Sequence, residues 1–214
     1  GCIHQLVTLI GNKFTSEHWD LICDHIAQAT VIMDAASNFF QSSSQSTSSW
    51  QDSNFLTCIT VQCRAQILLL DTCNDILNAH YDSMQSEHVE KFLNSLLTSY
   101  ETSRNLNTSQ VFSNFLKMQS VSVPLTEFIL QETISLTLSF NTLFMMIAET
   151  RTEFEDRVKL GHTLLIPLIE QLLKRYLYQV GVFKPAEDQK PDYLGSFINT
   201  QETEKLIPII VRAL

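Results

Sequence analysis

Hydrophobic residues recur along most of the chain at spacings of three and four positions, the repeat of one face of an α-helix. No stretch alternates between apolar and polar positions over the length of a strand. One helical face is formed by Trp19, Ile22, Ile26, Ala29 and Met33. The pattern predicts helices over residues 2–10, 16–37, 55–80, 87–106, 109–118, 124–149, 153–183 and 200–214.

Three residues mark places where these helices end, begin or bend. Gly11 suits a left-handed C-terminal cap on the first helix, because glycine carries no Cβ. Pro124 suits a first helical turn, where its missing N–H costs nothing. Pro167 predicts a bend within residues 153–183, because interior helix positions need that N–H.

Two polar segments separate helices. Residues 41–54 are rich in serine and predict a flexible loop. Residues 184–199 contain two prolines and several charges, and predict an inter-helix loop. The absence of an initiator methionine and the apolar C-terminal end lead us to expect a fragment of a larger protein.

The predicted helices follow one another closely enough to form successive antiparallel pairs. Helix pairs of this kind stack side by side in HEAT and armadillo arrays. We therefore expect an all-α fold, a HEAT/armadillo-like α-solenoid, with residues 1–214 forming a single helical-repeat region. The predicted pairs are 16–37 with 55–80, 87–106 with 109–118, and 124–149 with 153–183.

Charge and cysteine content exclude several functional classes. The formal net charge is −9, and the densest basic spot is only Lys174 with Arg175. An acidic surface repels phosphate backbones and anionic lipids, so we expect no nucleic-acid binding and no membrane attachment by charge. Charges interrupt the most apolar stretch, 164–178, which predicts a buried helix rather than a membrane span. The five cysteines form no CxxC motif and predict reduced thiols.

The triplet Ser-Glu-His occurs twice, at 16–18 and 86–88. Nucleophilic catalysis would need the serine within hydrogen-bond reach of an oriented base, and adjacent residues at a helix start point in different directions. A serine or threonine N-cap followed by a first-turn glutamate is instead an ordinary way to begin a helix. We predict that both triplets are helix starts and that neither is an active site.

No pattern in the sequence predicts a catalytic, metal or cofactor site. His18 and His25 share a helix face, but seven residues rise about 10 Å, too far for both to reach one zinc ion at about 2 Å. Asp20 and Asp24 fall on a predicted solvated face. The chain lacks the glycine-rich phosphate loops and the hydrolase and metalloprotease motifs. A helical enzyme or ligand-binding bundle is therefore disfavoured.

The most apolar helices leave two interpretations open. Large side chains in 124–149 form either core or the lining of a ligand pocket or partner groove. Polar residues within the apolar helices are either buried with partners or mark a binding face. The large side chains are Phe140, Phe144, Met145 and Met146. The polar residues are Gln62, Gln66, Gln131, Glu132 and Asn141.

Three sequence blocks, 61–77, 92–107 and 125–146, resemble a known family in their order and spacing. They are similar to the HEAT-like region downstream of the Sec-seven catalytic domain in the large brefeldin A-inhibited Arf guanine-nucleotide exchange factors. The second block is marked by Leu96, Leu97, Ser99, Tyr100 and Asn107. The other two contribute Cys63, Gln66, Leu130, Gln131, Glu132 and Phe144, for which we expect structural roles.

The resemblance implies a non-catalytic regulatory or scaffold region, because the catalytic glutamate of that family belongs to the Sec-seven domain. Its implied roles are membrane recruitment, autoregulation or dimerisation through protein–protein contacts in vesicle trafficking. The implied partners are small GTPases of the Arf and Rab type, other domains of the same chain and a second copy. The implied location is cytoplasmic, with indirect, peripheral association to Golgi and trans-Golgi network membranes. The alternative is an α-solenoid adaptor of an unrelated transport or tethering complex.

Overall fold

The structure is a computed structural model that describes residues 2–42, 53–108, 123–149, 153–179, 181, 182, 208 and 211. Side chains are described for 2–31, 60–105, 130–149, 153–174, 177, 181, 182, 208 and 211. Within these ranges the regular elements are helices and no strand occurs. The predicted all-α fold is therefore confirmed.

Seven α-helices account for most of the described chain. Short 3₁₀ turns, Gly11–Lys13 and Tyr81–Ser83, follow the first and third of them. A π-helical turn, Gly161–Leu165, joins the last two. The α-helices are α1 (Cys2–Ile10), α2 (Ser16–Ser42), α3 (Ser53–His80), α4 (Ser86–Thr108), α6 (Val123–Ala148), α7 (Phe154–Leu160) and α8 (Ile166–Gln179).

The predicted loop at 41–54 was too long, because α2 continues to Ser42 and α3 already begins at Ser53. Its central residues, 43–52, lie outside the described residues, as do the predicted helix at 109–118 and the loop at 184–199. Of the final predicted helix, 200–214, only Pro208 and Val211 are described. The remaining helices agree with the periodicity to within a few residues.

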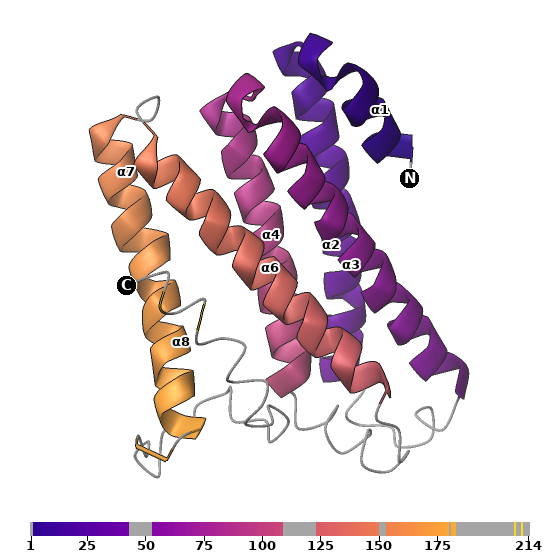
Figure 1. Cartoon of the computed structure of the whole chain (residues 1–214). Helices are drawn as coiled ribbons and strands as arrows, with labels where there is room; N and C mark the ends of the chain where they lie inside the picture. The colour runs from indigo at the N-terminus through magenta and orange to yellow at the C-terminus, as the bar shows by residue number, and fades with distance from the viewer. Residues whose placement is uncertain are drawn as a thin grey trace.

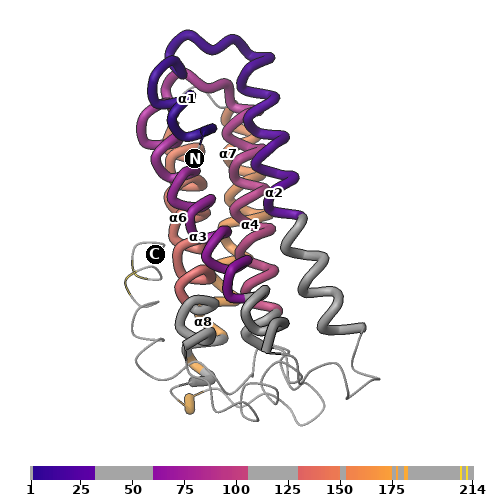
Figure 2. The backbone as a smooth tube through the Cα atoms, turned by 90° about the vertical axis from the view of Figure 1, so that its right-hand side faces the viewer, coloured from indigo at the N-terminus to yellow at the C-terminus, as the bar shows by residue number. Residues whose placement is uncertain are grey.

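The helices form two layers (Figures 1 and 2). One layer contains α1, α3 and α6, and the other contains α2, α4 and α7. The most extensive contact joins α4 to α6 across the layers, followed by α2 with α4 and α3 with α6 within them. Arg104 on α4 donates to Gln171 Oε1 on α8 at 2.8 Å. Alternation between two layers is the arrangement that stacked antiparallel helix pairs produce.

Of the predicted helix pairs, the second involves residues 109–118, which lie outside the described residues, and the third is present as the contact of α6 with α7. The helix predicted at 87–106 packs mainly on α6, and 124–149 packs more extensively on α4 than on the helices that follow it. The contact between α2 and α3, the first predicted pair, is present.

Gly11 does not form the left-handed cap that the sequence suggested. It begins a 3₁₀ turn, and Gly181 is the glycine with positive φ among the described residues. A Cβ at Gly11 would lie 2.8 Å from Cε1 and Nε2 of His80. Glycine is required here because α1 approaches the end of α3 closely.

The predicted irregularity near Pro167 occurs one turn earlier. The backbone widens into a π-turn at Gly161–Leu165, where the Ile166 N–H bonds to the Gly161 carbonyl. Proline clashes with the carbonyl four residues before it in a regular helix. The wider turn accommodates this clash, so α7 and α8 continue as one interrupted helix.

Serine and threonine hydroxyls allow polar positions to lie inside this all-helical core. Ser135, Ser139 and Thr142 on α6 are all nearly inaccessible. Each hydroxyl donates to the backbone carbonyl four residues earlier, at 2.8 Å. These bonds satisfy the donors without a partner on another helix. Phe140 and Met146 are buried and Phe144 packs against the core, so core packing is the correct interpretation of that apolar face.

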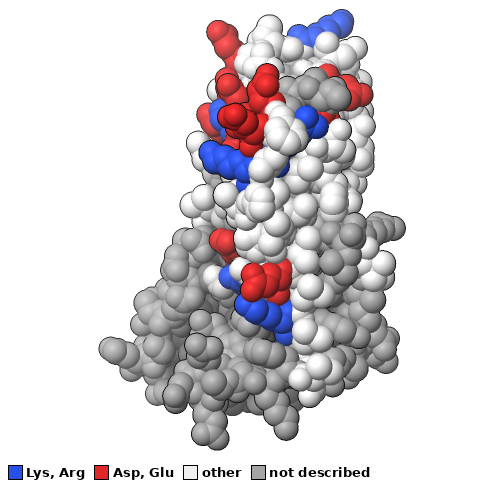
Figure 3. Space-filling view, turned by 90° about the vertical axis from the view of Figure 1, so that its left-hand side faces the viewer, with Lys and Arg blue, Asp and Glu red and all other residues white. Residues whose placement is uncertain are grey.

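The face that carries α7 and α8 has no continuous patch of one charge in its described part (Figure 3). Basic and acidic side chains gather in two groups with uncharged surface between them. In α8 the Lys174 ammonium pairs with the Glu170 carboxylate at 2.6 Å, one helical turn away. None of the described helices combines the length and the apolar character needed to cross a bilayer.

Candidate functional site

The two Ser-Glu-His triplets lie next to each other at the starts of α2 and α4. Ser16 Oγ, in the first triplet, donates to Gln85 Oε1 at 3.2 Å. It also lies 3.4 Å from Nε2 of His88, the histidine of the second triplet. No local pattern indicated this contact, because the residues are 72 positions apart.

In each triplet the histidine caps the helix to which it belongs. His18 Nδ1 accepts the Thr15 N–H at 3.2 Å, and His88 Nδ1 accepts the Gln85 N–H at 3.3 Å. Thr15 and Gln85 immediately precede the two helices, so each imidazole takes the role of the glutamate in a capping box. The predicted helix-start role is confirmed, but the capping group is the imidazole and not the serine hydroxyl.

The hydrogen bonds of His88 exclude it as a base for Ser16. Because Nδ1 accepts a backbone N–H, the proton of the neutral ring is assigned to Nε2. Nε2 then donates toward Ser16 Oγ, whereas a catalytic histidine must accept the serine proton. Asp20 Oδ1 lies 3.6 Å from the same nitrogen, so it cannot orient the ring from the opposite side. The cluster therefore joins two helices and cannot activate a nucleophile.

A charged pair lies beside this cluster. The Lys91 ammonium on α4 bonds to Asp20 Oδ1 on α2 at 2.5 Å and lies 3.9 Å from Asp24 Oδ1. The hydrogen bond from Lys91 lowers the pKa of Asp20, and the same bond raises the pKa of Lys91. Both side chains remain close to half exposed, so the pair fixes the register of α2 against α4 more than it adds stability.

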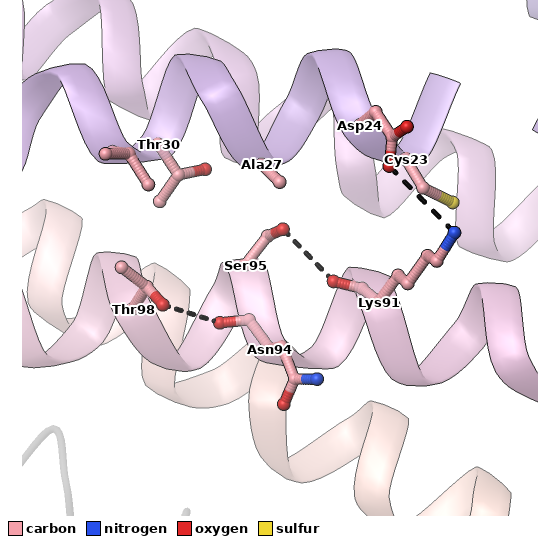
Figure 4. A pocket seen from close by; sticks show the side chains of 9 residues that line it. Cys23, Asp24, Ala27, Thr30, Lys91, Asn94, Ser95 and Thr98 are labelled. Carbon is pink, nitrogen blue, oxygen red and sulfur yellow. Dashed lines mark hydrogen bonds and ion pairs between the residues drawn. The ribbon is translucent and has the colours of Figure 1, made fainter. Parts of the chain in front are cut away.

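A groove between α2 and α4 begins at this pair (Figure 4). Its volume is about 210 Å³. The walls combine hydroxyl, charged and small apolar side chains from positions one turn apart on each helix. The lining residues are Cys23, Asp24, Ala27, Thr30, Val31, Lys91, Asn94, Ser95 and Thr98.

Burial favours the protonated form of the Cys23 and Cys73 thiols. Burial raises the pKa of Cys23 to about 12, and Cys23 Sγ lies 3.7 Å from the His88 carbonyl oxygen. Burial likewise raises the pKa of Cys73 to about 12. Nucleophilic and metal-binding cysteines act as thiolates, so these two side chains have core roles.

The three sequence blocks that carry the family resemblance meet in the core. The Cys63 thiol on α3 donates to Gln131 Oε1 on α6 at 3.3 Å. Gln131 Nε2 in turn donates to Ser99 Oγ on α4 at 3.3 Å. All three side chains are buried, so one chain of polar contacts ties together three helices and both layers.

The other residues of these blocks do not form a common site. Gln66 is buried and donates from Nε2 to the Ala29 carbonyl on α2 at 2.9 Å. Glu132 is also buried, whereas Leu130 is 46% exposed. Phe144 lies 6.3 Å from Phe140, ring centre to ring centre, in a stacked arrangement. The expected structural role therefore fits the buried members better than Leu130.

Metal binding finds no support in the described part of the chain. No group of three or more histidine, cysteine, aspartate or glutamate side chains there could hold an ion. His25 Nδ1 instead bonds to the Leu21 carbonyl of its own helix at 2.7 Å.

Comparison with known families decides where the chain belongs. A family model described as the BIG2 C-terminal domain matches residues 64–214, which is more than half of the chain. The chain belongs to the BIG2 C-terminal domain family. No curated protein and no solved structure matches it.

The region that matches the BIG2 C-terminal domain contains only part of the candidate site. It includes the second triplet, Lys91 and the α4 wall of the groove, and it leaves the first triplet and α2 outside. The matched region also contains nearly all of the three sequence blocks that carry the family resemblance, although Cys63 lies immediately before the first matched residue. The contacts from α2 to α4 and from Cys63 to Gln131 thus join the matched region to α2 and to the first part of α3.

Proposed function

We propose that this chain is a non-catalytic, HEAT-like α-solenoid region of a large Arf guanine-nucleotide exchange factor at the trans-Golgi network. It supports membrane recruitment, autoregulation or dimerisation by presenting helix faces to small GTPases and to other domains of its own chain. The observation that carries this proposal is the match to the BIG2 C-terminal domain family, because it covers the blocks that resemble those exchange factors.

Two features of the structure support a scaffold role. The helices alternate between two layers, and such arrays leave long helix faces free for partners. The strongest candidate for catalysis was the pair of Ser16 and His88. The proton of the His88 ring is assigned to Nε2, which donates toward Ser16 Oγ, and this arrangement disfavours catalysis. The polar groups of this cluster therefore serve helix packing.

The proposal is tested in the full-length protein by deleting residues 1–214, because a cut at residue 64 would divide α3 and expose the core on which α2 packs. We expect the deletion to lower the fraction of protein bound to Golgi membranes while the catalytic domain still exchanges nucleotide on Arf in solution. Complete loss of exchange from a protein that remains folded would assign catalytic residues to this region. Unchanged membrane association, exchange rate and oligomeric state would remove the case for a regulatory scaffold.

A further inference from the structure

The hydroxyl groups that line the groove between α2 and α4 offer hydrogen-bond acceptors, and no protons, to a ligand. Ser95 Oγ and Thr98 Oγ1 donate their protons to the carbonyls of Lys91 and Asn94, at 3.1 and 2.9 Å (Figure 4). Thr30 Oγ1 on the facing helix donates to its own helix in the same way, at 2.9 Å. A hydroxyl that has used its single proton offers only lone pairs to a ligand.

The charged end of the groove also favours a ligand that donates hydrogen bonds. Asp24 is a lining residue whose side chain is 60% exposed, and its contact with Lys91 is long, at 3.9 Å. The Lys91 ammonium is held by Asp20. The Asn94 side chain points away from α2 in Figure 4. The Asp24 carboxylate is therefore the strongest group available to an incoming ligand.

The remaining wall suits an aliphatic stem. Ala27 and Val31 line the groove one helical turn apart, and Val31 is 59% exposed. Drug-sized ligands occupy pockets of roughly 300–1,000 Å³, whereas this groove measures about 210 Å³. Its size fits one long side chain better than a cofactor.

We propose that this groove binds an arginine side chain from a basic segment of a partner protein. The guanidinium meets the Asp24 carboxylate and the neighbouring hydroxyl oxygen of Ser95, and the methylene stem lies along Ala27 and Val31 toward Thr98 at the other end of the groove (Figure 4). Arginine fits because it carries five donors and no acceptor in a planar fork, together with an apolar stem. The exposed acidic residues Glu17, Glu87 and Glu90 at the same ends of α2 and α4 attract a basic segment.

This inference goes beyond the proposed function, because it concerns one groove and one side-chain chemistry, whichever protein supplies it. A failure of the chain to bind Arf or Rab proteins would leave it standing, and its own failure would leave the scaffold role untouched.

The test is an NMR titration of the full chain with a blocked, alanine-based dodecapeptide that contains one arginine. A twin peptide carries citrulline, which has the same shape without the charge. We expect the arginine peptide to shift the amide signals of Ala27, Val31, Ser95 and Thr98 and the citrulline peptide to bind at least tenfold more weakly. Equal binding of the two peptides, or no shift in the groove at millimolar peptide, would overturn the proposal.

Two variants separate the groove from general charge attraction. Asp24→Asn keeps the shape and removes the carboxylate, and should raise the Kd about tenfold, the effect of one charged hydrogen bond. Asp71→Asn removes the same charge from an exposed position on α3 and should change the Kd less than about twofold. An equal loss in both variants would show non-specific attraction and overturn the assignment. Far-ultraviolet circular dichroism confirms that both variants are folded.

Discussion

The Cys63 thiol on α3 donates a hydrogen bond to Gln131 on α6, from a position 68 residues earlier in the chain. The Gln131 amide in turn donates a hydrogen bond to Ser99 on α4. A buried amide with one partner on each of two other helices sets the register of all three. It also explains why a glutamine is compatible with one of the most apolar helices of the chain.

Replacing Gln131 should destabilise the fold measurably. Gln131→Met keeps a similar volume but leaves the Cys63 and Ser99 side chains without this partner. We expect the free energy of unfolding to fall by about 1–3 kcal/mol, measured by urea denaturation. The adjacent Leu130→Ala, at a position 46% exposed, should cost only about 0.5 kcal/mol. An equal cost for both would argue against a stabilising role for the buried contacts.

The two glycines of the helical region should respond to alanine with opposite signs. Gly11→Ala places a Cβ 2.8 Å from the His80 ring, and should cost about 1–2 kcal/mol. Gly161→Ala meets no atom within 4 Å in a helical conformation, and should stabilise by up to about 1 kcal/mol. Thermal unfolding of both variants measures the difference. A Gly11→Ala protein as stable as the parent would show that His80 moves aside freely.

The histidines of the two triplets should contribute unequally to stability, although both cap a helix. His18 is exposed, so His18→Ala should cost about 1 kcal/mol, the value of a cap. His88 is 1% exposed, so His88→Ala also leaves a cavity and should cost about 2–3 kcal/mol. Chemical denaturation of the two variants provides the comparison. Equal losses would mean that the contacts of His88 with α2 add nothing.

The Asp20–Lys91 pair predicts a defined pH dependence. The folded-state pKa of Asp20 is lowered, so its stabilisation is present above about pH 3.9 and is lost as pH falls through the folded value. The pKa of Lys91 is raised, so its stabilisation is present below about pH 10.4 and is lost as pH rises through the folded value. The stability difference between the parent and Asp20→Asn should therefore shrink below about pH 4 and above about pH 10. A difference that persists unchanged at pH 3 would rule out the ionic origin.

The thiols should react in an order set by burial. Cys2 is exposed, whereas Cys23 and Cys73 are buried with pKa values raised to about 12. Brief iodoacetamide treatment at pH 8 should alkylate Cys2 and leave Cys23 and Cys73 unmodified until the chain is denatured. Peptide mapping by mass spectrometry identifies the labelled residues. Labelling of Cys23 as fast as Cys2 would mean that α2 separates readily from α4.

The sequence predicted the features that depend on local spacing. Periodicity located α4 and α6 closely, and the positions of Pro124 and Pro167 indicated a helix start and an irregular turn. It could not locate the Ser16–His88 or Asp20–Lys91 contacts, because each depends on side chains about seventy residues apart. The predicted role of Gly11 was wrong for the same reason, because the requirement for glycine comes from the His80 ring on another helix. The groove was missed because each of its walls alone resembles an ordinary helix face.

Binding to small GTPases tests the central claim of a protein-binding scaffold most directly. The full chain, and in parallel the full-length protein, would be titrated with Arf and Rab proteins loaded with GTP or with GDP, by calorimetry. The scaffold account predicts that at least one GTPase binds with a tenfold or greater preference for its GTP-bound state. Failure of both the chain and the full-length protein to bind any of them in either state would contradict it.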